Sequence, residues 1–214
     1  MTGVKAALCA TVLIAGVAQA DVGVTAKIGT LGVGADATFP LSENVNLRLN
    51  YNAASYDFIR EEDAGDVLTD FDWTSYGAML DWHAFKGSFR FTLGVFQNDN
   101  QVDLTGDLTA PVDLGGVEYS LSALSGAITF EDLAPYIGIG FGNAIDEEGR
   151  WHFNCDFGVL FQGEPEVDAV AVSTFSFLQP VVDDALQEEV DEIEDDLSFF
   201  TIYPVVSIGA SYRF

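Results

Sequence analysis

Alternation of apolar and polar residues recurs along most of this chain, and it restricts the possible folds more than any other feature. Between residues 151 and 161 the sequence WHFNCDFGVLF places large apolar side chains at nearly every odd position and polar residues or glycine at most even positions. The same period of two appears in 31–39, 45–52, 89–95 and 202–214. Because successive side chains of a strand point to opposite faces, each segment predicts a β-strand with one face in an apolar medium. A half-buried soluble sheet has the same pattern, so alternation alone leaves that alternative open.

Two features favour a transmembrane barrel over a soluble sheet. Aromatic residues lie near the ends of the apolar stripes, where outer-membrane barrels carry aromatic girdles. They are Phe39, Trp82, Phe89, Trp151, Tyr212 and Phe214. The connections also alternate in length, as expected for short periplasmic turns and long outer loops. The short ones are 41–43, 85–87 and 145–149, and the long ones are 59–71, 99–133 and 163–197.

The last residues provide a third indication. The chain ends in Ser211-Tyr212-Arg213-Phe214. A final strand that finishes in aromatic-x-Phe resembles the terminal signal that the barrel-assembly machinery reads in outer-membrane barrels. We therefore expect Tyr212 and Phe214 to act as a C-terminal insertion signal.

Counting the alternating segments predicts an all-β fold, an eight-stranded antiparallel up-and-down transmembrane β-barrel. Seven strands are expected at 31–40, 44–58, 72–84, 88–98, 134–143, 149–163 and 199–214, and the eighth at 22–28. The apolar positions change parity near Gly29-Thr30, which requires a tight turn or a bulge there. A single bent strand over 22–40 remains the competing interpretation.

One segment departs from the period of two. Leu186, Val190, Ile193 and Leu197 follow the spacing of one face of a helix, which predicts an amphipathic helical insertion at 179–198 in the last outer loop. Such a helix would serve either as a stiffener of the loop or as a lid across the mouth of the barrel.

The first 20 residues have the three parts of a secretory signal peptide. Lys5 supplies the positive charge, an apolar run follows, and Ala18-Gln19-Ala20 provides a small-x-small cleavage site. We therefore expect 1–20 to be removed and the barrel to occupy 21–214.

The basic residues of the predicted strands that have a clear alternation fall on the polar face, which lines the lumen, and Asp36, Asp81 and Asp156 share that face. An eight-stranded barrel is just wide enough for side chains to fill its interior. Opposite charges must pair there, because an isolated buried charge costs several kcal/mol. We therefore expect an ionic and hydrogen-bonded plug rather than an open pore. The predicted lumen network consists of Lys27, Asp36, Arg48, Asp81, His83, Arg90, Arg150, His152 and Asp156.

The other acidic residues are concentrated in the long connections. Most of the 34 Asp and Glu residues lie in 61–72, 99–132 and 164–196, which contain no Lys or Arg, and the chain has a formal net charge of -26. Nucleic acid is not expected as a partner, because phosphate binding needs a basic surface. One interpretation of these loops is a solvated, repulsive surface. The other is capture of Ca²⁺ by carboxylates and bridging to anionic lipopolysaccharide, although 191–196 matches no defined calcium loop.

No residue pattern points to catalysis. Neither of the two histidines, His83 and His152, is followed by serine in a His-x-Ser arrangement. Nucleotide, zinc and haem signatures are lacking in the sequence, so we expect neither an enzyme nor a cofactor. The alternating glycines Gly138, Gly140 and Gly142 are expected to leave space for a Tyr or Arg side chain opposite.

With these motifs the chain resembles the small outer-membrane barrels of the OmpA-like and opacity-type group, and more closely an uncharacterised family of proteobacterial barrels. The stretches that carry the resemblance are 29–34, 40–42, 46–48, 80–82, 134–136, 158–163 and 203–207. The resemblance implies a location in the outer membrane of a Gram-negative cell and insertion by the barrel-assembly machinery. We also expect a monomer in contact with outer-membrane lipid and lipopolysaccharide. It carries no catalytic residue across.

Two functions of different class are compatible with these observations. The first is a structural or surface-interaction barrel with a charge-plugged lumen and anionic extracellular loops. The second is a small channel, like the OmpW group, that passes small or apolar solutes and is gated by the loop helix. The balance of charges expected in the lumen favours the first.

Overall fold

Eight strands close a barrel in the computed structural model, which describes residues 22–62, 65–85, 87–108, 111–114, 116–146 and 149–214. Their order around the barrel is β5-β4-β3-β2-β1-β13-β11-β10, with β10 paired back to β5 and all neighbours antiparallel. The bounds are β1 Gly23–Gly29, β2 Gly32–Ser42, β3 Val45–Glu62, β4 Gly65–Trp82, β5 Phe89–Asn98, β10 Leu133–Phe141, β11 Trp151–Phe161 and β13 Ile202–Arg213. The predicted eight-stranded barrel is confirmed. The predicted signal peptide, 1–20, lies outside the described residues.

The segment 22–40 forms two strands and not one bent strand. β1 and β2 pair along their length up to Gly29 opposite Gly32, which leaves Thr30 and Leu31 as a two-residue turn. Gly32 has a φ of 94°, a left-handed conformation that glycine adopts without steric cost. The change of parity in the sequence therefore marks a tight turn.

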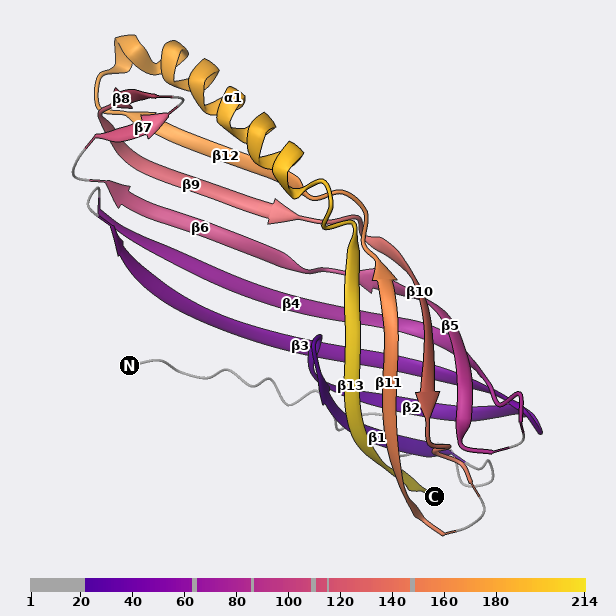
Figure 1. The fold of residues 1–214 in the computed structure, drawn as a ribbon. Coiled ribbons are helices and arrows are strands. Elements are labelled where there is room, and N and C mark those ends of the chain that lie inside the picture. Colours follow the sequence, from indigo (N-terminus) through magenta and orange to yellow (C-terminus); the bar gives the residue numbers. More distant parts are fainter. Residues whose placement is uncertain (1–21, 63–64, 86, 109–110, 115, 147–148) are drawn as a thin grey trace.

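The long connections contain strands, which corrects the expectation of loops over 59–71, 99–133 and 163–197. β3 and β4 are 18 residues long each, and beyond the barrel further strands join them in the order β3-β4-β6-β9-β12. These strands are β6 Gln101–Leu108, β9 Leu121–Thr129 and β12 Glu166–Ser173, and a hairpin of β7 Val112–Leu114 and β8 Val117–Tyr119 follows β6. We call this part the sheet extension. Figure 1 shows it projecting from one end of the barrel, away from the end that holds the C-terminus.

The helix lies over the sheet extension and not across the mouth of the barrel (Figure 1). The helical residues are η1 Ser176–Leu178 and α1 Gln179–Leu197, close to the predicted bounds. α1 buries Val182, Leu186 and Val190, and the first two join an apolar cluster with Leu108 and Leu121 of the extension. This packing favours the role of a stiffener over that of a lid.

No helix among the described residues has the length and apolar character needed to cross a membrane.

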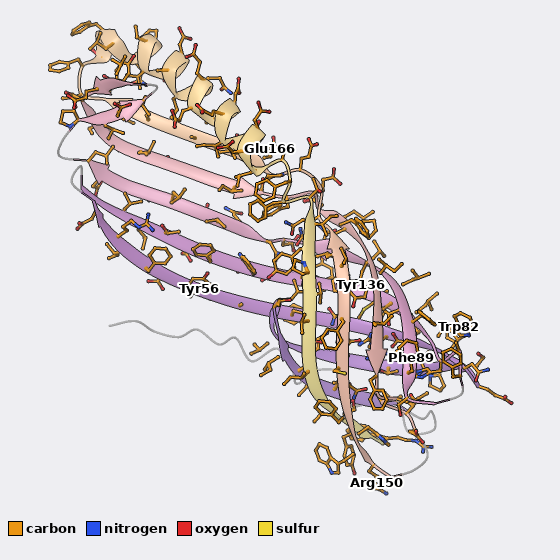
Figure 2. All side chains as sticks on the ribbon, in the orientation of Figure 1. Tyr56, Trp82, Phe89, Tyr136, Arg150 and Glu166 are labelled. Atoms are coloured by element: carbon orange, nitrogen blue, oxygen red, sulfur yellow. The ribbon has the colours of Figure 1, made fainter. Side chains whose placement is uncertain are left out.

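The outward face of the barrel is apolar. One group of its aromatic residues lies at the end that holds the β2–β3, β4–β5 and β10–β11 connections, which we call the turn end. Trp82 lies 5.9 Å from Phe91 between ring centroids, Trp151 lies 5.1 Å from Tyr212, and Tyr212 lies 5.0 Å from Phe214. Figure 2 shows Trp82 and Phe89 together at this end. The period of two thus separates an apolar outer surface from a lumen that holds the charged side chains.

Candidate functional site: the charged lumen

Six charged side chains from six strands meet inside the barrel, and we call them the lumen cluster. They are Lys27 of β1, Asp36 of β2, Arg48 of β3, Asp81 of β4, Arg90 of β5 and Asp156 of β11. Each occupies an inward position of its strand, because its neighbours in sequence face the outer surface. The three cations and three carboxylates balance one another within the cluster.

Arg48 is the centre of the cluster. Its Nη2 donates to Asp81 Oδ1 at 2.9 Å, and its Nη1 donates to Asp156 Oδ2 at 3.0 Å. Nη1 also lies 3.4 Å from Asp36 Oδ2. Nε lies 2.9 Å from Asp81 Oδ2, as an ion pair without a hydrogen bond. The side chain is only 4% exposed, so one buried guanidinium group contacts three buried carboxylates.

Two further ion pairs flank this centre. Arg90 Nη2 donates to Asp156 Oδ1 at 2.7 Å, and Arg90 Nη1 donates to the carbonyl oxygen of Gly142. Lys27 Nζ lies 2.9 Å from Asp36 Oδ1. Arg90–Asp156 and Lys27–Asp36 would therefore remain as matched pairs if Arg48 and Asp81 were both removed.

Neutral polar side chains on inward positions satisfy the remaining carboxylate oxygens. Thr92 Oγ1 donates to Asp81 Oδ1 at 2.6 Å, and Asn50 Nδ2 donates to Asp36 Oδ1 at 2.5 Å. Asn52 continues the chain by donating to Asn50 Oδ1. These residues were not predicted as members of the network. The signal was available, because Asn50 and Asn52 share the parity of Arg48 in the alternating segment 45–52.

Inward glycines accommodate the large side chains of the lumen. A Cβ atom at Gly140 would lie 2.7 Å from Cζ of Arg90, and one at Gly138 would lie 2.5 Å from Oη of Tyr136. A Cβ atom at Gly158 would overlap the same ring, 2.6 Å from Cε2. A Tyr and an Arg thus occupy the space that the alternating glycines predict. Because these glycines lack a Cβ atom, the side chains of Tyr136 and Arg90 fit beside them in a narrow barrel.

An apolar layer lies in the lumen on the side of the cluster that faces the sheet extension. Its members are Leu31, Met79, Phe96, Ala134, Tyr136, Leu160 and Val205. Figure 2 shows Tyr136 within the barrel, between the extension and the turn end. Between this layer and the cluster is a cavity of about 20 Å³, which borders Arg48, Phe96 and Tyr136. A second cavity of about 10 Å³ borders His83 and Arg90 on the other side of the cluster. Each volume is near that needed for a single water molecule.

Three residues of the predicted network do not contact its carboxylates. Arg150 precedes β11 at the turn end (Figure 2), is exposed, and donates to Tyr212 Oη at 3.0 Å. His152 faces inward, but its Nε2 is buried without a hydrogen-bond partner. His83 is buried beside the second cavity and contacts Asn46 and Gly87 instead. The prediction that these three residues join the ionic network is corrected, because they lie closer to the turn end than the lumen cluster does.

His83 should make the stability of the barrel depend on pH. Burial lowers the pKa of His83 below its ordinary value and outweighs the opposing effect of the hydrogen bond from Nδ1 to the carbonyl oxygen of Gly87. The folded state therefore binds fewer protons than the unfolded state just below about pH 6.5, and stability is lost as the pH falls through that range. Urea unfolding at pH 7.5 and at pH 5.5 should show a larger loss for the wild type than for His83→Gln. Equal losses in the two proteins would contradict this assignment.

The described residues contain no group of three or more His, Cys, Asp or Glu side chains arranged to hold a metal ion.

Comparison with known proteins identifies the fold. No family model and no curated protein matches the chain. Among solved structures, CarO2 of Acinetobacter baumannii is 20% identical with a TM-score of 0.60, over 91% of this chain and 99% of CarO2. CarO of the same organism is 22% identical with a TM-score of 0.58, over 91% of this chain and 98% of CarO. The likeness to both proteins covers the barrel and the sheet extension together.

Proposed function

We propose that the chain is an outer-membrane β-barrel protein with a closed lumen, which serves as a membrane-anchored support for an acidic extracellular surface. The observation that carries this proposal is the lumen cluster. Its three cations and three carboxylates neutralise one another across six strands. A conducting pore needs a continuous polar path. Here an apolar layer that would exclude water lies next to the lumen cluster.

The outer surface and the ends of the barrel support placement in an outer membrane. Exposed apolar side chains cover the strands, and aromatic side chains gather at the turn end. On this proposal Tyr212 and Phe214 serve as the insertion signal for the barrel-assembly machinery. Outer-membrane lipid and lipopolysaccharide surround a monomeric barrel.

The acidic surface belongs to the sheet extension. Asp57 of β3, Asp70 of β4 and Asp103 of β6 occupy directly opposed positions on neighbouring strands. Like charges in such positions destabilise a sheet. The proposed role explains this arrangement, because an acidic surface stays solvated and repels other anionic surfaces.

A narrow channel for small solutes is the second candidate, and the two cavities on either side of the cluster favour it. The cavities lie in the lumen, so a rearrangement of Arg48 would bring them into contact. On this alternative the wild-type protein conducts. If the helix acts as a gate, deletion of 180–197 raises the conductance.

Single-channel recording in planar bilayers tests the proposal. The wild-type protein should show no conductance steps. The triple variant Arg48→Ala/Asp81→Ala/Tyr136→Ala should conduct, because it opens both layers and leaves Lys27–Asp36 and Arg90–Asp156 paired. The matched control Arg150→Ala/Asp57→Ala removes the same pair of charges from exposed positions and should remain silent. Conductance by the wild type would overturn the proposal in favour of the channel.

A further inference from the structure

β12 is the last strand of the sheet extension, and its pairing leaves one edge of its backbone open. Within the described residues it pairs only with β9. An open edge exposes a row of N–H and C=O groups that can pair with a strand of another chain, and proteins protect such edges with helices or charges.

Side chains of α1 bind this edge in place of a neighbouring strand. Gln179 Nε2 donates to the carbonyl oxygen of Ala171 at 2.8 Å, and Gln179 Oε1 accepts from the N–H of Ser173 at 2.9 Å. At the other end of β12, Glu194 Oε1 accepts from the N–H of Val167 at 2.9 Å. The amide of Gln179 therefore makes the two contacts that a paired strand would make.

Apolar burial holds the helix in this position. Val182 is fully buried, and Leu186 and Val190 are nearly so. Val182 and Leu186 pack in the cluster that contains Leu121 of β9 and Ala171 of β12. Docking of α1 therefore removes apolar surface from water at the same time as it covers the edge.

The charge of the helix opposes the same docking. α1 has nine acidic and no basic residues, and its partner strand β12 adds Glu166 and Asp168. No Lys or Arg occurs in 99–149 or in 151–212. Like charges four residues apart repel one another along a helix, and acidic residues in the last turn are unfavourable beside the negative end of the helix dipole. The pairs four residues apart are Asp184–Glu188, Glu188–Glu192, Asp191–Asp195 and Glu192–Asp196.

We propose that α1 is an ionic-strength-dependent cover of the β12 edge. Apolar burial is nearly insensitive to moderate salt, whereas repulsion among exposed carboxylates depends on screening. The screening length is about 3 Å at 1 M and about 30 Å at 0.01 M ionic strength. At high ionic strength α1 docks and closes the edge. At low ionic strength it undocks and exposes the β12 edge and the apolar cluster to solvent.

Hydrogen exchange of the refolded full chain in zwitterionic micelles tests this proposal, with tetramethylammonium chloride as a salt that screens charge without coordinating carboxylates. Backbone amides of 166–173 and 179–197 should exchange about tenfold faster at 0.01 M than at 1 M salt, from the summed repulsion of the acidic pairs. Amides of β13 in the barrel should exchange at the same rate in both conditions. An equal rate for the α1 and β12 amides in both conditions would overturn the proposal.

Two variants with the same change in charge separate the charge of the helix from that of the whole chain. The test variant neutralises exposed carboxylates of α1 as Glu188→Gln/Glu192→Gln/Asp195→Asn/Asp196→Asn and should lose most of the salt dependence. The control variant neutralises exposed carboxylates on the sheet face opposite to Leu108 as Asp57→Asn/Asp66→Asn/Asp70→Asn/Asp107→Asn. It should retain the salt dependence. Equal behaviour of the two variants would show that charge on α1 is not the cause.

A third variant tests the contacts at the edge. Gln179→Ala removes the hydrogen bonds to Ala171 and Ser173. It should raise the exchange rate of the Ser173 amide, which loses its acceptor, even at 1 M salt. Unchanged protection in this variant would mean that α1 does not cover the edge through Gln179.

Discussion

Arg48→Ala should destabilise the folded barrel by about 3–5 kcal/mol, the range measured when one partner of a buried ion pair is removed. The guanidinium group contacts Asp36, Asp81 and Asp156, and it is almost completely buried. After its removal Asp36 keeps the cation Lys27 and Asp156 keeps Arg90, but the nearest cation left to Asp81 is Arg90, at 3.5 Å. The free energy of unfolding, measured by urea titration in lipid vesicles through tryptophan fluorescence, reports this loss.

Two comparisons make that measurement specific to the cluster. Arg150→Ala removes an exposed guanidinium group that bonds to Tyr212 Oη, and it should change stability by no more than about 0.5 kcal/mol. Arg48→Ala/Asp81→Ala should recover part of the loss, because each remaining carboxylate has a cation within 3 Å. If Arg48→Ala unfolded at the same urea concentration as the wild type, the lumen cluster would not be a determinant of stability.

Gly158→Ala should destabilise the barrel by about 1–3 kcal/mol, the usual cost of adding atoms to a well-packed interior. The added Cβ atom would overlap the ring of Tyr136, which is 4% exposed and lies between Gly138 and Gly158. The ring would have to leave its position in the apolar layer. The change in the free energy of unfolding is measured by the same urea titration.

The matched control and a second substitution identify the cause. Gly126→Ala in β9 places a Cβ atom 3.4 Å from its nearest neighbour, the carbonyl oxygen of Asp168, and should have little effect. In a double-mutant cycle, Tyr136→Leu should relieve most of the cost of Gly158→Ala, because the two changes share one contact. Additive effects in the cycle would show that Gly158 and Tyr136 do not compete for the same space.

The sequence predicted the inward position of each member of the lumen cluster but not which members would touch. Arg48 and His152 both have inward parity, and only Arg48 reaches the carboxylates. The height of a residue in the lumen depends on the stagger between neighbouring strands, as in the pairing of Arg48 with Met79 on β4. Stagger is a property of the closed barrel, so it does not appear in the alternation of any one strand.

The sheet extension was missed for a different reason. β6 contains two Asp and one Gly, and β12 contains Glu, Asp and two Ala, all residues of low strand propensity. Their conformation depends on β4, which extends beyond the barrel and offers an unpaired edge to β6. Once β6 is paired, β9 and β12 add in turn. The strand propensity of one segment gives no information about a free strand edge that another segment offers for pairing.

The sequence by itself determined the strands of the barrel, the apolar and polar faces of each strand, and the bounds of the helix, because these depend on a local period of two or 3.6 residues. Only the tertiary structure decided the neighbours of each charge, the position of α1 on the edge of β12, and the continuation of the barrel wall into a sheet. These features depend on strand register and on hydrogen bonds between segments far apart in the chain, and local periodicity carries no information about either.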